Sequence, residues 1–297
     1  MALALLAAAM GARAQAAARP EYELAFHRGD YARAKALAEK RLAAVPGDVP
    51  ARILAARADA AQGRFDAAFD GFRAALRRSP RNADALYYLG VTASVLAQVE
   101  LDRLVAEFPD SARARQVKAR AHEAAGRKAE ARAEYEAALA ASPEDLEVLV
   151  ALGELRRAEM AFDDAASYYA RALARDPSNY DALYGLGACR AYERKHDEAA
   201  DLFRRAVAAF PESAAARLAL GLSLLQTARA EEAVTQLREA ARIEPRMRQA
   251  HYQLGRAYQS LGRAAEAEAA FAKAQELLKQ EHETEGGGAA PDPGEVP

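Results

Sequence analysis

The sequence predicts an all-α fold, a right-handed solenoid of about eight antiparallel helical hairpins with a period of 34 residues. The first observation behind this prediction is a run of prolines that lie 34 residues apart, except for one gap of 29: Pro46, Pro80, Pro109, Pro143, Pro177, Pro211 and Pro245. A fixed period of this length indicates one supersecondary unit that is stacked many times. Because a stacked array has no single core to outgrow, a chain of 297 residues need not divide into two ordinary domains.

The second observation is that residue size recurs within the unit. When the proline is numbered 32, position 20 is alanine: Ala34, Ala68, Ala131, Ala165, Ala199, Ala233 and Ala267. Position 8 is alanine or glycine, and position 24 is mostly large: Phe72, Tyr135, Tyr169, Phe203, Leu237 and Phe271. Small residues allow two antiparallel helices to approach closely, and a large residue fills the space between adjacent units.

The third observation concerns the ends of the helices. Four units have glycine at position 15, where a turn joins the two helices of a hairpin: Gly29, Gly63, Gly126 and Gly262. Glycine permits such a turn because it adopts positive φ without a steric penalty. The proline at position 32 ends the second helix, because the residue before a proline disfavours the helical conformation.

The first element, residues 1–18, is predicted to be a signal peptide. Leu3 to Met10 is apolar but too short to span a bilayer, and Ala14-Gln15-Ala16 fits a small-residue cleavage site. No Lys or Arg precedes the apolar run, so a frayed alanine-rich helix or a start codon placed too far downstream stays open. We expect a periplasmic or secreted protein, and otherwise a cytoplasmic one. No integral membrane span is expected.

The next elements form the solenoid over residues 19–278. In the N-terminal block, 19–82, the first unit has a shortened first helix and Arg41 where alanine is expected, which suits a polar cap. The third unit, 83–109, lacks five residues in the turn between its helices, so we predict one continuous helix from Ala83 to Glu107. A C-terminal block follows over 110–278. Residues 279–297, poor in apolar residues and containing Gly and Pro, are predicted to form a disordered tail.

Charge and chemistry point away from several classes of protein. Lys plus Arg is 41 and Asp plus Glu is 43, a net charge of -2, which argues against a nucleic-acid partner. The single cysteine, Cys189, excludes an internal disulfide and is interpreted as a small buried hydrophobe. The five histidines lie in different units without a recurring metal-ligand spacing, and no nucleophile, phosphate-loop or metalloprotease motif occurs. We therefore predict no enzyme activity, no metal site and no cofactor.

The unit from Tyr180 to Pro211, YDALYGLGACRAYERKHDEAADLFRRAVAAFP, shows the whole pattern most clearly: Leu-Gly at positions 7 and 8, Ala at 20, an aromatic at 24, Ala at 27 and Pro at 32. This pattern resembles the tetratricopeptide repeat, and the resemblance extends from about residue 20 to residue 278. The tryptophan that the family usually has at position 4 is replaced by Leu86, Leu149, Leu183 or His251.

The resemblance implies that first helices line a concave groove through positions 2, 5, 9 and 12. The predicted partner-binding residues are Tyr87, Gln116, Arg120, Glu154, Tyr184, Leu218, Leu222, Leu225, Tyr252 and Arg256, and Val150, Ala188 and Gln259 occupy the same positions. Leu218, Leu222 and Leu225 have helical spacing, and a tyrosine flanks them from each neighbouring unit. Such a cluster resembles a peptide-anchoring patch. The alternative that these leucines pack against the next helix stays open.

The sequence thus predicts a non-catalytic scaffold that binds an extended peptide or a partner helix in its groove, with cell-envelope assembly as the context that the signal peptide suggests. Two other functions stay open: an accessory or regulatory subunit of a separately encoded enzyme, and a binder of a glycan or a small hydrophobic ligand. Family members that clamp chaperone C-termini use Lys and Asn at positions 5 and 9. These residues are absent here, so that activity is not expected.

Overall fold

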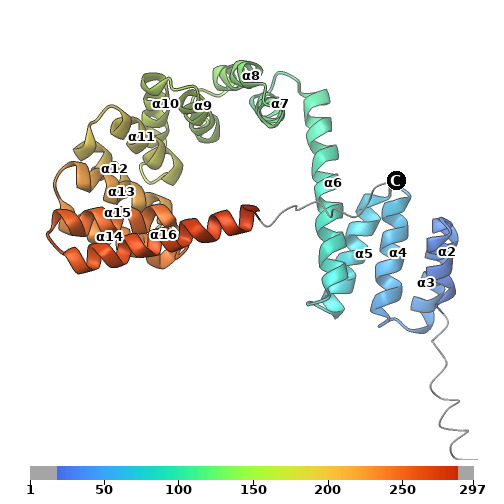
Figure 1. The fold of residues 1–297 in the computed structure, drawn as a ribbon. Coiled ribbons are helices and arrows are strands. Elements are labelled where there is room, and N and C mark those ends of the chain that lie inside the picture. The colour runs from blue at the N-terminus through green and yellow to red at the C-terminus, as the bar shows by residue number, and fades with distance from the viewer. Residues whose placement is uncertain (1–18, 287–297) are drawn as a thin grey trace, which may run out of the picture. The chain divides into compact units, whose positions relative to one another are not determined.

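The computed structural model describes residues 19–286, and all regular elements within this range are helices (Figure 1). The helices form two compact units that divide between Phe108 and Pro109. The predicted signal peptide, residues 1–18, and residues 287–297 lie outside the described residues. The prediction of an all-α fold built from helical hairpins is confirmed.

Unit 1 contains two hairpins and one long helix. Its helices are α2 (Glu21–His27), α3 (Tyr31–Ala44), α4 (Val49–Ala61), α5 (Phe65–Arg78) and α6 (Ala83–Glu107). α2 is only seven residues long, as the shortened first helix of the first unit predicts. The side chains of Asp30, Asp48 and Asn82 accept a hydrogen bond from the backbone N–H three residues later, so α3, α4 and α6 each begin at a side-chain cap.

Helix α6 is continuous for 25 residues, and its bounds agree with those predicted from the short third unit. No glycine or proline interrupts it after Gly90, and the missing residues are those that form the turn elsewhere. Only Ala85 and Thr92 are buried in α6, while apolar side chains such as Val91 and Val99 are exposed. The loss of the turn therefore replaces a hairpin by a single helix that lacks a second helix folded back along it.

Unit 2 contains five hairpins that follow one another in chain order (Figure 1). Their first helices are α7 (Ala112–Ala124), α9 (Leu146–Ala158), α11 (Tyr180–Tyr192), α13 (Ala214–Gln226) and α15 (Arg248–Ser260). Their second helices are α8 (Lys128–Ala141), α10 (Phe162–Arg175), α12 (His196–Ala209), α14 (Ala230–Ile243) and α16 (Ala264–Gly286). Each second helix packs against the first helix of its own hairpin, and each one before α16 also packs against the next first helix, which builds the core of the solenoid.

The prediction of a disordered tail from residue 279 is wrong for its first part, because α16 continues to Gly286. Residues 279–285, KQEHETE, contain neither glycine nor proline, so nothing in this segment stops a helix. Arg248 of α15 also donates a hydrogen bond to Glu281, with 3.0 Å between Nε and Oε2, which ties the extension to the neighbouring helix. Low apolar content alone therefore did not identify the end of the helix.

One buried ring in the core of unit 2 lies between two first helices. Tyr169 of α10 is 0% exposed. A Cβ atom added to Gly153 of α9 would lie 2.6 Å from its ring, and one added to Gly185 of α11 would lie 2.3 Å from it. Both distances are shorter than any real contact of a Cβ atom, so α9 and α11 approach the ring from two sides because they present only glycine backbone to it.

The turns between the two helices of a hairpin share one backbone conformation, and three of the described hairpins adopt it without glycine. The four predicted glycines have positive φ, and Met160, Arg194 and Ala228 occupy the same repeat position with φ of 61°, 62° and 58°. The left-handed conformation costs a residue with a side chain about 1 to 2 kcal/mol. These three turns are therefore strained, and their sequences gave no sign of it.

Replacing Ala228 by glycine is expected to stabilise unit 2 by about 0.5 to 1 kcal/mol, because the relief of strain exceeds the extra chain entropy that glycine loses on folding. Thermal unfolding followed by circular dichroism measures the change. The matched control is Gly126→Ala, which introduces the same strain at the equivalent turn and should destabilise the protein by a similar amount. An Ala228→Gly protein that is less stable than its parent would contradict the assignment of strain.

Candidate binding groove

The first helices of unit 2 lie on the inner side of the array. α11 contacts α9 and α13, and α13 contacts α15. Within the described part of the chain, no two second helices pack against each other to a comparable extent. An array curves toward the side on which neighbouring helices are closer. Positions 2, 5, 9 and 12 of the first helices, which the sequence analysis selected, therefore lie on the face that the curvature encloses.

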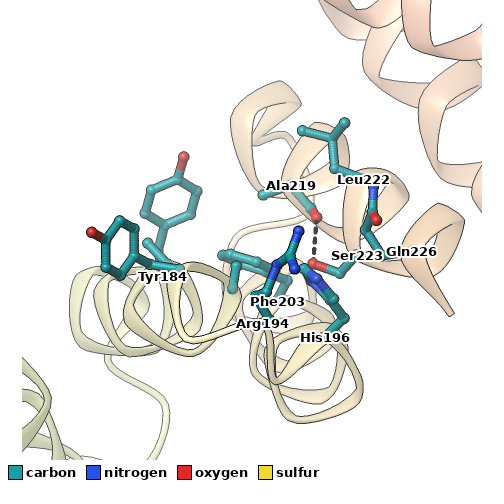
Figure 2. Close-up of a pocket in the computed structure, with 11 residues that line it drawn as sticks. Tyr184, Arg194, His196, Phe203, Ala219, Leu222, Ser223 and Gln226 are labelled. Carbon is teal, nitrogen blue, oxygen red and sulfur yellow. Dashed lines mark hydrogen bonds between the residues drawn. The ribbon is translucent and has the colours of Figure 1, made fainter. Parts of the chain in front are cut away.

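The predicted apolar residues on this face divide into two groups. Tyr184 of α11 and Leu222 of α13 line a pocket of about 590 Å³ (Figure 2). Leu218 and Leu225 are half-buried and pack against the hydrophobic core between α12 and α15. The alternative that the leucines serve packing thus describes Leu218 and Leu225, whereas Leu222 faces the pocket.

The remaining predicted residues of the C-terminal hairpins lie on α15. Tyr252 is 49% exposed, and its ring centroid lies 5.6 Å from that of the half-buried Phe271. Arg256 is exposed and donates a hydrogen bond to Gln253 of its own helix. Both side chains are accessible to a partner, next to the hairpin that carries Leu222.

The predicted residues on α7 belong to a polar network instead. Gln116 is only 3% exposed, and its amide nitrogen donates to Glu147 at 2.8 Å while its oxygen accepts from Arg113. Arg120 is exposed and donates to the same carboxylate. These bonds, that of Gln116 first, hold the pKa of Glu147 below its ordinary value. The side chain of Gln116 is therefore engaged within the protein and offers little surface to a partner.

Glu154 of α9 combines an exposed position with a structural contact. Its side chain is 41% exposed and forms an ion pair with Arg157. Its other oxygen accepts a hydrogen bond of 2.6 Å from the hydroxyl of the buried Tyr169. Burial, and then this hydrogen bond, raise the pKa of Tyr169 far above its ordinary value. The last predicted residue, Tyr87, is 66% exposed on α6 and belongs to unit 1, whereas all the others belong to unit 2.

The pocket beside Leu222 lies between α11 and α13 and is closed below by α12. Phe203, 3% exposed, forms its floor, and burial raises the pKa of Tyr184 at its side. Figure 2 shows Tyr184 on one side, Leu222 and Gln226 on the other, and Arg194 and His196 between them. The hydroxyl of Ser223 in the wall donates to the carbonyl of Ala219 at 3.0 Å. The pocket is thus apolar at its base and cationic at its rim.

The sequence analysis missed the rim. Four residues line the pocket but lie outside positions 2, 5, 9 and 12: Tyr192 and Gln226 at position 13, Arg194 in the turn, and His196 at the start of α12. A search extended to the turn would have found them, because the turn sits directly beside the end of the first helix. A second pocket of about 450 Å³ adjoins this rim and contains Met160, Phe162 and Tyr192 together with three acidic residues: Asp163, Asp164 and Glu193.

Outside the groove, the single cysteine is part of the packed core. Cys189 is completely buried, and burial raises its pKa to about 11, so the interpretation as a small buried hydrophobe is confirmed. Over residues 19–286, no group of three or more His, Cys, Asp or Glu residues could hold a metal ion. Over the same range, none of the helices combines the length and apolarity that a membrane crossing requires.

Comparisons with known families agree with the geometry. Models described as tetratricopeptide repeat match residues 53–93, 112–155 and 149–214. A model described as anaphase-promoting complex, cyclosome, subunit 3 matches residues 193–274. None of the curated proteins matches the sequence.

Solved structures show the same fold. A crystal structure of MamA is 25% identical, with a TM-score of 0.53, and the match covers 56% of this chain and 96% of MamA. MamA from Desulfovibrio magneticus RS-1 is 21% identical, with a TM-score of 0.54, covering 57% of this chain and 96% of that one. YrrB, described as a tetratricopeptide repeat protein with an unusual peptide-binding site, is 20% identical, with a TM-score of 0.55, covering 60% and 92%.

Proposed function

Because this chain belongs to the tetratricopeptide repeat family, we propose that it is a non-catalytic scaffold that holds an extended peptide or a partner helix against the first helices of unit 2. Stacked hairpins present these helices as one row, and several weak contacts along the row add up to a useful affinity. The exposed polar side chains of Arg120 on α7 and Glu154 on α9 set the register of the bound segment, and the apolar side chains on α11 and α13 anchor it.

The observation that carries this proposal is the pocket beside Leu222. A leucine at this position has no packing role in the core cluster, yet it stands over a cavity of about 590 Å³ whose floor is an aromatic ring. Binding energy concentrates where a partner inserts a large side chain into such a cavity and displaces water from it. The pocket is therefore the point at which a partner would make its strongest contact.

Site-specific photo-crosslinking tests the proposal. Gln226, an exposed residue that lines the pocket, is replaced by a photo-reactive phenylalanine derivative, and the protein is irradiated in an extract of its own cells. The control carries the same derivative in place of Ala170, which is exposed on the second helix α10. We expect a discrete crosslinked partner at position 226 and none at position 170. Crosslinking only at position 170 would reject the groove as the binding site.

The same pocket also favours a second candidate function. Its volume lies within the range of about 300 to 1,000 Å³ that is typical of small-molecule sites. A small hydrophobic ligand would then occupy it without a protein partner, and would quench the emission of Tyr184 and Tyr192 in the isolated protein. We further propose that the protein acts in the bacterial cell envelope, which the sequence of residues 1–18 supports. N-terminal sequencing of the native protein would reveal a chain that begins at Ala17.

A further inference from the structure

Two neighbouring pockets on unit 2 share one wall. Tyr192, the last residue of α11, lines both the pocket of about 590 Å³ and the pocket of about 450 Å³. Its ring is 59% exposed and stacks on Phe162 of α10, with 3.7 Å between the ring centroids. Met160, 65% exposed, lies beside this pair. An exposed apolar ridge therefore separates two adjoining cavities.

The two cavities carry opposite charge. Arg194 and His196 lie at the rim of the larger cavity. Within residues 19–286, neither side chain forms a hydrogen bond, an ion pair or a ring contact. The acidic residues of the smaller cavity differ in whether they form an ion pair. Asp164 pairs with Arg156, and Glu193 pairs with Arg190 and Lys195. Asp163 has no such pair in the described part of the chain. Free positive charge and free negative charge thus face solvent on either side of the ridge.

Backbone strain marks the same two cavities. Among residues 19–286, three residues other than glycine adopt positive φ; of these, Met160 lines the smaller cavity and Arg194 lines the larger one. Ala228 has the same conformation at the equivalent position, so the repeat itself imposes this backbone. The turn thereby places the side chains of Met160 and Arg194 at the borders of the two cavities.

We propose that the two cavities form one recognition surface for a partner segment with ordered charges. A large apolar side chain enters the larger cavity beside Leu222, an adjacent acidic residue meets Arg194 and His196, and a basic residue across the ridge meets Asp163. This inference rests on the proposed scaffold function and adds the chemistry of the partner. Arg194 lies in the turn and His196 begins α12, so the site differs from one built on positions 5 and 9 of the first helices.

Four fluorescein-labelled peptides with blocked ends test the inference on the full-length protein. The first peptide is named KFE after its three recognition residues. It contains lysine, a serine spacer, phenylalanine and glutamate in that order. The others change one feature each: EFE replaces the lysine, KFK replaces the glutamate, and KAE replaces the phenylalanine. Fluorescence anisotropy should show that the parent protein binds KFE most tightly at low salt. The loss of one charge contact should weaken binding about threefold to fivefold, as for an exposed ion pair, and high salt should reduce the difference.

Charge reversal in the protein should redirect the preference. Arg194→Glu should bind KFK more tightly than KFE, and Asp163→Lys should bind EFE more tightly than KFE. Both residues are exposed, so both variants should fold, and circular dichroism verifies this. Asp163→Asn provides a milder second variant, which should bind KFE and EFE equally.

Equal binding of all four peptides to the parent, or preferences that do not move with the charge reversals, would overturn the inference. These results would leave the scaffold function intact if crosslinking through position 226 still captures a partner. In the reverse case, a peptide preference that follows the charges without any captured partner would support the recognition surface and would show that the crosslinker at position 226 does not reach the bound segment.

Discussion

Replacing Tyr169 by alanine is expected to destabilise unit 2 by about 3 to 5 kcal/mol, the cost of removing a large aromatic side chain from a packed core. The ring is fully buried and lies within contact of Gly153 on α9 and Gly185 on α11. Its removal would open a cavity between two adjacent hairpins, because helices that approach this closely through glycine have no side chain with which to fill it. The substitution also leaves Glu154 without its phenolic donor.

Hydrogen exchange measured by mass spectrometry on the full-length protein checks this result. Peptides from α9, α10 and α11 should exchange faster in Tyr169→Ala, while peptides from unit 1 provide an internal control. The matched variant Tyr169→Phe keeps the ring and loses only the hydrogen bond to Glu154, so it should cost about 1 kcal/mol. Equal destabilisation by the two variants would show that the hydroxyl, and not the packing of the ring, carries the contribution.

Replacing Leu222 by glutamate is expected to weaken binding of the groove partner by about 2 kcal/mol, or roughly thirtyfold, as for a hot-spot residue. The substitution places a charge over the apolar base of the pocket and next to Phe203. Leu222 does not belong to the packed core, so the fold should tolerate the change. The effect should therefore appear in binding and not in helicity.

The measurement is the amount of partner that immobilised parent and variant proteins retain from one extract, over a range of protein concentrations. Leu278→Glu is the matched control, since it makes the same substitution at a leucine that is 38% exposed on α16, away from the pocket. The control should retain the partner as the parent does. Retention by Leu222→Glu at parental levels, with its helicity intact, would place the interface outside the groove.

Most of the fold followed from the sequence because its signals are local. The deletion of the turn in the third unit predicts the bounds of α6, and the small residues at position 8 predict the close approach of Gly153 to Tyr169 and of Gly187 to Phe203. The approach of Gly185 to Tyr169 was not predicted, because Gly185 lies outside the recurring positions. The extension of α16 was missed because composition was used where the absence of helix breakers decided the outcome. The turns at Met160, Arg194 and Ala228 show that the hairpin imposes its backbone even where the sequence lacks glycine.

The candidate site was predicted less completely than the fold because it depends on contacts between neighbouring hairpins. Repeat position selected both Leu222 and Leu218, but it could not show that Leu222 lines the pocket whereas Leu218 packs against the core cluster, because that depends on the neighbouring helices. The position of Gln116 is likewise equivalent to that of Tyr184, yet Glu147 from the next hairpin buries its amide. The rim residues lie in a turn whose direction appears only once two hairpins are packed together.

The hydrogen bond between Tyr169 and Glu154 also sets how the protein responds to alkali. A phenol in an unfolded chain ionises near its ordinary pKa of 10.0, whereas burial and the carboxylate keep the phenol of Tyr169 neutral well above that pH. Tyr135 is equally buried and donates to Glu123 at 2.6 Å, and its pKa is raised for the same reasons. A group whose pKa is raised by folding contributes stability below its unfolded pKa and loses it as the pH rises further. Each of these two phenols therefore lowers the free energy of unfolding by about 1.4 kcal/mol per pH unit above 10, until the pH reaches the pKa of the folded state. Alkali should therefore destabilise unit 2 through two of its buried rings.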